Sequence, residues 1–246
     1  MVKLVRLDPA DPQTERLWAT VIRVAGVLGD NPGWCLVGGL MVALHAIEAG
    51  RDARPTADID ILADARSRVM SPAQVSGRLV EHGASLHELS GLDGERGFRL
   101  ALDGEIVDIL APDGLTSNPT TLGNLTTIQV PGGTQALRRL ETVRLELEGA
   151  DATIRRPTLA GAILLKARAL PVHSDPPAQR QDLVTLLSLL DEPRAMRAEL
   201  SGQEIGWLRS IDRHLALDDA TLAATFDPAR LRAAEVAFAI LTREDR

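Results

Sequence analysis

Asp58 and Asp60 are the residues of this sequence whose types and spacing best suit chemistry. They lie in the segment Ala57-Asp58-Ile59-Asp60-Ile61-Leu62, where carboxylates alternate with isoleucines. This alternation predicts a β-strand, because side chains along a strand point to its two faces in turn. The two carboxylates then share one face, and at that separation they repel each other unless a cation lies between them. The segment therefore predicts a divalent-metal site, and a solvated edge strand is the alternative.

A third carboxylate follows from a predicted hairpin. Two strand-like runs, 98–102 and 105–110, flank Asp103-Gly104, and Asp-Gly between such runs is a strong signal for a two-residue turn. The register of this turn places Arg99 directly opposite Asp108. Asp108 is then a candidate third metal ligand, and a plain surface ion pair with Arg99 is the alternative. Arg99 itself is equally open to a structural or a substrate-binding role.

A glycine pair precedes these strands and suggests an anion site. Gly38 and Gly39 lie between a short apolar strand, 34–37, and a predicted helix over 40–49. Glycine lets the backbone turn sharply and approach a ligand closely. The amides at the start of a helix bind anions such as phosphates. A polar loop over 51–55 then leads through Thr56 into the acidic strand.

The remaining elements divide the chain into an α+β fold with two parts. Helices are predicted over 12–29 and 72–83, and strands over 126–130, 142–147 and 152–155, with a turn at 131–133 between the first two. From Pro157 onward the pattern is helical, at about 158–170, 178–190, 194–200, 203–215 and 228–242. We expect an α/β domain over 1–156 and a helical domain over 157–246.

Composition excludes several classes of protein. The chain has 246 residues, 45% of them hydrophobic, and a formal net charge of -7, so it can bury a core and cannot be a uniformly basic nucleic-acid-coating protein. The one cysteine, Cys35, allows no internal disulfide. No apolar stretch reaches the roughly 18 residues of a membrane span, and the first residues are too polar for a signal peptide. We expect a cytoplasmic protein with no membrane partner.

The order of strand, Gly-Gly turn, helix, Asp-Ile-Asp strand and later single-Asp strand resembles the polymerase-β-like nucleotidyltransferase superfamily. Within it, four segments resemble the AbiEii-type nucleotidyltransferases, the toxins of type IV toxin–antitoxin pairs, which include the mycobacterial MenT toxins. These segments are 36–39 (LVGG), 54–60 (RPTADID), 164–170 (LLKARAL) and 180–183 (RQDL). The resemblance covers about residues 34–190. It departs at Gly39, where many superfamily members have a serine whose hydroxyl can touch the triphosphate.

The resemblance implies a fold and an activity. The fold is a mixed central sheet flanked by helices, followed by a C-terminal helical bundle. The activity is transfer of a nucleoside monophosphate from an NTP to a hydroxyl, with release of pyrophosphate. Two Mg²⁺ ions roughly 3.5–4 Å apart neutralise charge in such a reaction. The implied acceptor is RNA, plausibly the 3′ end of tRNA, and the implied protein partner is a cognate antitoxin.

The resemblance also assigns roles to residues. Asp58 and Asp60 bridge the two metal ions, and Asp108 holds the ion on the side of the attacking hydroxyl and helps to deprotonate it. The remaining implied residues lie at the nucleotide: Gly38, Gly39, Thr56, Lys166 and Asp182.

Several alternatives stay open. The acceptor is alternatively a small molecule such as an aminoglycoside, or the chain is a non-catalytic nucleotide-binding or interaction module. Lys166 is alternatively a snorkelling lysine, and Arg180 and Asp182 are alternatively parts of an exposed helix face. We expect His45 to pack in the core. Five arginines either form a basic rim for triphosphate or RNA or are scattered and solvated: Arg51, Arg54, Arg155, Arg156 and Arg168.

Overall fold

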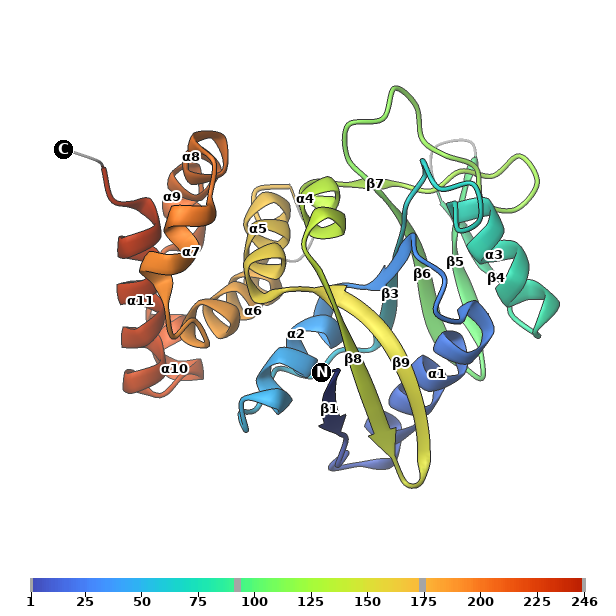
Figure 1. The fold of residues 1–246 in the computed structure, drawn as a ribbon, viewed down its shortest axis with the longest axis horizontal. Helices are drawn as coiled ribbons and strands as arrows, with labels where there is room; N and C mark the ends of the chain where they lie inside the picture. The colour runs from blue at the N-terminus through green and yellow to red at the C-terminus, as the bar shows by residue number, and fades with distance from the viewer. Residues whose placement is uncertain (1, 91–93, 173–175, 245–246) are drawn as a thin grey trace.

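A mixed six-stranded sheet forms the centre of the N-terminal half of the molecule (Figure 1). The computed structural model describes residues 2–90, 94–172 and 176–244. Five strands follow the order β2-β3-β6-β5-β4, and β7 pairs with β6. Their bounds are β2 Trp34–Leu36, β3 Asp58–Ala63, β4 Ser85–Ser90, β5 Arg96–Leu102, β6 Glu105–Pro112 and β7 Gln129–Val130. Strands β3 and β6 run parallel at the middle of the sheet.

The register at the middle of the sheet is the one that the Asp-Gly turn predicts. Arg99 of β5 pairs with Asp108 of β6. On the other side of β6, Asp108 pairs with Asp60 of β3. Ile59 and Ile61 of β3 are buried on the opposite face from the aspartates, as a period of two requires. The predicted strands and hairpin are therefore confirmed.

Helices cover the apolar face of this sheet. The first is α1, Pro12–Leu28, which begins where the Asp11 side chain accepts hydrogen bonds from the amides of Gln13 and Thr14. Helix α3, Pro72–Glu81, lies beside it. Both helices contribute to the same hydrophobic core as the isoleucines of β3. The opposite face, which carries the aspartates, shares a smaller core with α4, Gly133–Arg138, and α5, Leu159–Ala169.

A second sheet packs on the outer side of α1. It contains β1, Lys3–Arg6, β8, Leu140–Leu147, and β9, Ala150–Pro157, in the order β1-β8-β9. The expectation that strands 126–130 and 142–147 are joined by a simple turn is wrong. Helix α4 separates them, because the Asp113 carboxylate accepts hydrogen bonds from the amides of Gly132 and Thr134 and starts a helical turn there.

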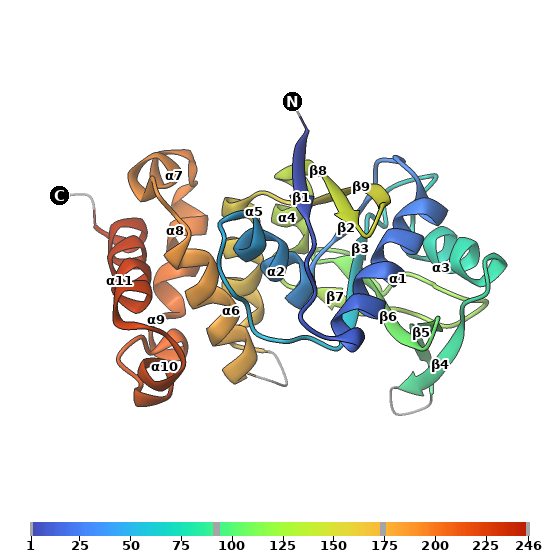
Figure 2. The same ribbon diagram turned by 90° about the horizontal axis from the view of Figure 1, so that it is seen from below.

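The C-terminal part is entirely helical and lies at one end of the molecule (Figure 2). After α5 it contains α6 Pro176–Ser188, α7 Pro193–Glu199, α8 Gly202–Ser210, α9 Asp212–Leu215, α10 Ala220–Thr225 and α11 Pro228–Thr242. Helix α2, Gly38–Glu48, contributes Met41 and Val42 to the core of these helices. The expected α+β class, a mixed sheet flanked by helices with a helical C-terminal part, is confirmed. Among the described residues, no helix is long and apolar enough to cross a membrane.

Arg156 ties α2 to the second sheet. Its side chain is 0% exposed. The guanidinium contacts the Glu48 carboxylate of α2 and donates from Nε to Glu141 of β8 at 2.9 Å. The expectation that Arg156 belongs to a basic rim is wrong, because the side chain is a buried bridge between two elements.

We expect Arg156→Ala to lower the free energy of unfolding by about 3 kcal/mol, because it leaves two carboxylates without their buried partner. The matched control is Arg144→Ala, which removes an exposed ion pair with Asp151 on the same sheet and should change stability little. Urea denaturation measures both variants. Equal losses would contradict the structural role of the buried bridge.

Candidate active site: three aspartates beside a helix N-terminus

Asp58, Asp60 and Asp108 converge on the face of the sheet opposite α1. Each offers a carboxylate oxygen, and these oxygens lie within 4.8 Å of one another. The convergence follows from the backbone, since Asp60 and Asp108 are register partners on parallel strands and Asp58 precedes Asp60 by two residues. The structure therefore brings together the three carboxylates that the sequence predicts as metal ligands.

The electrostatics of this group favour a bound cation. Burial, and next the charges of Asp58 and Asp108, raise the pKa of Asp60 to about 7, while Lys166 and Arg99 oppose the shift. Burial also raises the pKa of Asp108, against a lowering by its hydrogen bond from Arg99. Within the described part of the chain, no side chain donates a hydrogen bond to the Asp60 carboxylate. A divalent cation would satisfy this carboxylate and remove the repulsion.

The donor set fits Mg²⁺. Magnesium prefers hard oxygen ligands and is usually held by one or two carboxylates together with phosphate and water oxygens. Asp60 offers both oxygens, and Asp58 offers one that the neighbouring Thr56 does not use. Lone pairs of Asp108 complete the group.

Gly38 brings the N-terminus of α2 against these carboxylates. It adopts φ +67°, a conformation that favours glycine. A Cβ atom at this position would overlap the Asp60 carboxylate. The amide of Val37 also donates to the Asp60 carbonyl at 2.9 Å. No side chain caps α2 at Val37, so its first amides are available to an anion beside the three aspartates.

Thr56 fills the space that a side chain at Gly39 would take. A Cβ atom on Gly39 would lie 2.6 Å from Thr56 Oγ1. The same hydroxyl donates to Asp58 Oδ1 at 3.0 Å. A hydroxyl is therefore present near the start of α2, although it comes from the loop before β3 and not from residue 39.

A cluster of three charged side chains lies beside the aspartates. Lys166 of α5 is 4% exposed, and its Nζ lies 2.8 Å from Asp182 Oδ2 of α6. Arg54 donates to the same carboxylate from Nε at 2.7 Å and from Nη2 at 3.1 Å. Because both residues are buried, the interpretations of Lys166 as a snorkelling side chain and of Asp182 as part of an exposed face are wrong. Asp182 holds two cations in place.

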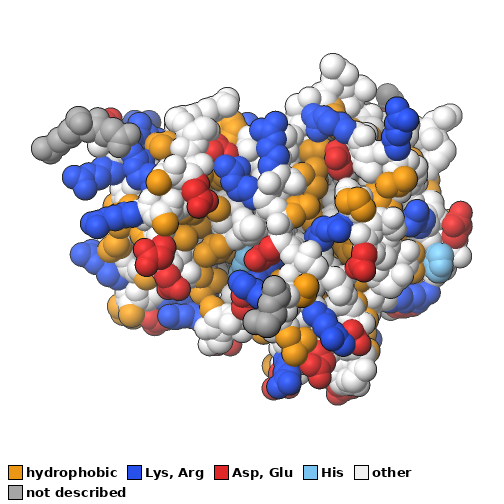
Figure 3. All heavy atoms as spheres, in the orientation of Figure 1, with side chains coloured by type: hydrophobic (Ala, Val, Ile, Leu, Met, Phe, Trp, Pro, Cys, Tyr) orange, Lys and Arg blue, Asp and Glu red, His pale blue; other side chains and the backbone are white. Residues whose placement is uncertain are grey.

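Four of the arginines expected in a basic rim lie apart from one another: Arg54, Arg155, Arg156 and Arg168. Arg54 binds Asp182, whereas Arg155 donates to the Asp30 carbonyl and Arg168 stacks over Trp207 at 4.6 Å. Arg180, expected either on an exposed helix face or near the nucleotide, is 17% exposed and pairs with Asp219 at 2.7 Å. Figure 3 shows Lys and Arg side chains spread over both halves of one face instead of gathered in a stripe. Of these four rim candidates, only Arg54 contacts the charged group beside the aspartates.

Two contacts of the site were missed by sequence reasoning. Glu88 of β4 pairs with Arg99 at 2.9 Å, and the exposed strand β4 has no apolar alternation that would have revealed it. The pairing of Arg54 with Asp182 joins residues 128 positions apart. Both residues lie within segments that had been singled out, but nothing local indicates that they meet.

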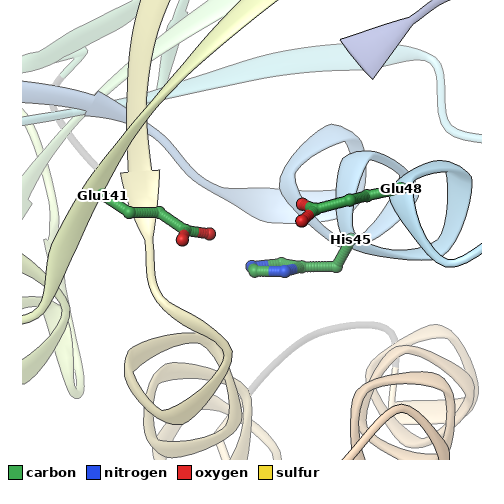
Figure 4. A group of neighbouring side chains, drawn as sticks. All are labelled: His45, Glu48 and Glu141. Carbon is green, nitrogen blue, oxygen red and sulfur yellow. The ribbon is translucent and has the colours of Figure 1, made fainter. Parts of the chain in front are cut away.

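A second cluster of side chains that could bind a metal stabilises the fold instead. His45 and Glu48 of α2 and Glu141 of β8 point toward one another (Figure 4). These carboxylates already form ion pairs with cations of the protein, Arg156 and Lys3. The Nζ atom of Lys3 lies 2.6 Å from Glu48. Burial and the charge of Arg156 lower the pKa of His45 to about 3, and its Nε2 lies 3.0 Å from the Pro157 carbonyl. The expectation that His45 packs in the core is confirmed.

Asp60 should make stability depend on pH. Its folded-state pKa of about 7 lies above the ordinary value of 3.8, so between these values the folded state holds a proton that the unfolded state lacks. Stability from this group is therefore lost as pH rises from about 4 to 7. In EDTA, Asp60→Asn should become more stable than wild type across this window, by on the order of 2–4 kcal/mol at pH 8. Urea unfolding at several pH values measures the difference, and a difference independent of pH would contradict the repulsion.

Gly38→Ala should damage the site far more than Gly50→Ala. The two glycines have φ of +67° and +65°, so both variants carry similar backbone strain, about 1–2 kcal/mol. A Cβ at Gly50 meets nothing within 4 Å, whereas at Gly38 it overlaps the Asp60 carboxylate. Gly38→Ala should therefore lose more stability and also bind Mn²⁺ more weakly. Urea unfolding and Mn²⁺ titration test this, and similar behaviour of the two variants would count against the close packing.

No protein-family model and no curated protein matches the sequence. Among solved structures, the fold is similar to that of an antigenic nucleotidyltransferase-like protein from Paracoccidioides brasiliensis. The match has 10% sequence identity, covers 90% of this chain and 93% of that chain, and has a TM-score of 0.44. At this score the likeness assigns no family, so the chemistry of the site is inferred from its own side chains.

Proposed function

We propose that this chain is a metal-dependent nucleotidyltransferase, which transfers a nucleoside monophosphate from an NTP to a hydroxyl acceptor and releases pyrophosphate. The observation that carries the proposal is the convergence of Asp58, Asp60 and Asp108 within 4.8 Å beside the uncapped N-terminus of α2. Carboxylates suited to divalent ions and amides suited to phosphate thus lie together. This combination matches the charge of an NTP bound with its metal.

The residues around the aspartates would bind and orient the triphosphate. Asp58 and Asp60 would hold Mg²⁺, which when bound neutralises charge on the phosphate and attacking oxygens. The amides at Gly38 and Gly39 would receive the β- and γ-phosphates, since an uncapped helix N-terminus binds anions. Lys166, kept in place by Asp182, would supply a positive charge beside them. Thr56 would orient Asp58 through its hydrogen bond.

Asp108 would act on the acceptor. Its register position beside Asp60 would place it next to the hydroxyl that attacks the α-phosphate. Burial raises the pKa of this carboxyl group, which increases its affinity for a proton. It would therefore accept the proton from the acceptor hydroxyl as the new bond to phosphorus forms.

The proposed acceptor is RNA, plausibly the 3′ end of tRNA, and the proposed context is a toxin restrained by an antitoxin. Support comes from the four segments that resemble the AbiEii-type enzymes, because they contact one another at the aspartates. The first packs on the second through Gly38 and Asp60. The second reaches the fourth through Arg54 and Asp182, and the third reaches it through Lys166. These contacts between the four segments support the resemblance on which the proposed RNA acceptor rests.

Incubation with each α-³²P-labelled NTP, Mg²⁺ and total RNA tests the proposal. Wild type should label RNA, and Asp58→Ala and Asp108→Asn should reduce the rate at least about 100-fold, as loss of a group acting in the transition state does. Lys166→Ala should reduce it less. Arg144→Ala, which alters only an exposed ion pair, is the matched control and should retain full activity.

The same assay with an aminoglycoside as acceptor, together with calorimetry, distinguishes the alternative functions. Transfer to an aminoglycoside and not to RNA would show that the acceptor is a small molecule. The proposed transfer reaction would then still hold. Absence of transfer to either acceptor, together with NTP binding that does not depend on Mg²⁺ in calorimetry, would replace the enzyme by a non-catalytic nucleotide-binding module.

A further inference from the structure

One of the three aspartates is already occupied by a cation of the protein. Arg99 donates to both oxygens of Asp108, from Nε to Oδ1 at 2.9 Å and from Nη2 to Oδ2 at 2.9 Å. This is the two-pronged geometry in which guanidinium and carboxylate bind most strongly. The third donor, Nη1, binds Glu88 Oε1 at 2.9 Å. Arg99 is therefore held between a buried aspartate of the site and an exposed glutamate of β4.

The other two aspartates are not occupied in this way. Among the residues that the structure describes, one donates a hydrogen bond to the Asp58 side chain, through the Thr56 hydroxyl. Asp60 accepts none from any described side chain. Because an ionised carboxylate has about four lone-pair positions, Asp108 keeps roughly half of its capacity while Arg99 is bound. The site is therefore asymmetric, open at Asp58 and Asp60 and partly closed at Asp108.

We propose that Arg99 is an internal competitor for metal at Asp108, so that the free protein binds one divalent ion tightly, at Asp58 and Asp60, and a second ion only weakly. The inference rests on the proposed function, in that it concerns the same carboxylates, and it adds the residue that controls how many ions they hold. Arg99 is not a catalytic residue here, since it acts on the bound metal only through Asp108.

The surroundings of Arg99 allow it to leave Asp108. Its side chain is 34% exposed, whereas that of Asp108 is 6% exposed. Glu88, at 52% exposure, lies at the solvent side of the guanidinium. Arg99 can thus move outward while it keeps its contact with Glu88. A second ion brought with the triphosphate would compensate the charge that Arg99 leaves behind.

Titration of metal-free protein with Mn²⁺, followed by the electron paramagnetic resonance signal of free Mn²⁺ at pH 8, tests this inference. Wild type should bind one ion tightly. Arg99→Gln, which removes the charge and the two-pronged bond, should bind a second ion at least about tenfold more tightly than wild type, a change of about 1.4 kcal/mol. Arg99→Lys should give an intermediate value, because an ammonium group cannot engage both oxygens in the same way. If Arg99→Gln fails to fold, the Arg99→Lys result decides.

Two control variants test whether the change in Mn²⁺ binding is specific to Arg99. Arg96→Gln removes a charge of the same strand that pairs with Glu95 at 3.8 Å on the surface and should leave both affinities unchanged. Glu88→Gln releases the outer contact and should leave Arg99 on Asp108, so that the second ion binds no more tightly than in wild type.

The outcomes separate this inference from the proposed function. Unchanged or weaker Mn²⁺ binding in Arg99→Gln would overturn the inference, because Arg99 would then orient Asp108 for metal instead of competing with it. Tight binding of two ions by wild type would overturn it as well. The expected Mn²⁺ results combined with no nucleotide transfer would support the role of Arg99 and overturn the proposed function alone.

Discussion

Electrostatic repulsion among three carboxylates constrains how the elements around the candidate site are arranged. Two neighbouring parallel strands place the oxygens of Asp58, Asp60 and Asp108 within 4.8 Å of one another, on a face from which water is partly excluded. Such an arrangement opposes folding unless positive charge offsets it. The protein supplies part of that charge through Arg99 and Lys166, both of which lower the pKa of Asp60. The remainder is the cation for which the site is suited.

Neighbouring elements are adapted to this cluster. The start of α2 can approach it because residue 38 has no side chain, and Thr56 uses the space left by the second glycine. The helical part contributes through Asp182, which binds Lys166 of its own half and Arg54 of the loop before β3. One buried carboxylate thus connects the two halves of the chain at the site.

Local patterns in the sequence predicted the part of the fold that local interactions determine. The Asp-Gly turn was sufficient to place Arg99 opposite Asp108, and alternation was sufficient to place Asp58 and Asp60 on one face. Strand β4 was not predicted, because its residues are almost all exposed and it forms only by pairing with β5. Helix α4 depends on Asp113, about twenty residues away. Arg156 could not be distinguished from a surface arginine, since its partner Glu48 lies 108 positions away. Glu141, its other partner, lies directly opposite it in the β8–β9 hairpin.

The three aspartates are proposed to hold metal for a nucleotide bound at the N-terminus of α2. Diffraction at the manganese absorption edge, from crystals grown with Mn²⁺ and a non-hydrolysable NTP analogue, would locate both the metal and the triphosphate. We expect an anomalous peak in contact with the carboxylates of Asp58 and Asp60, and triphosphate density at the amides of Gly38 and Gly39. A nucleotide bound elsewhere, or a manganese peak away from these aspartates, would contradict this proposal.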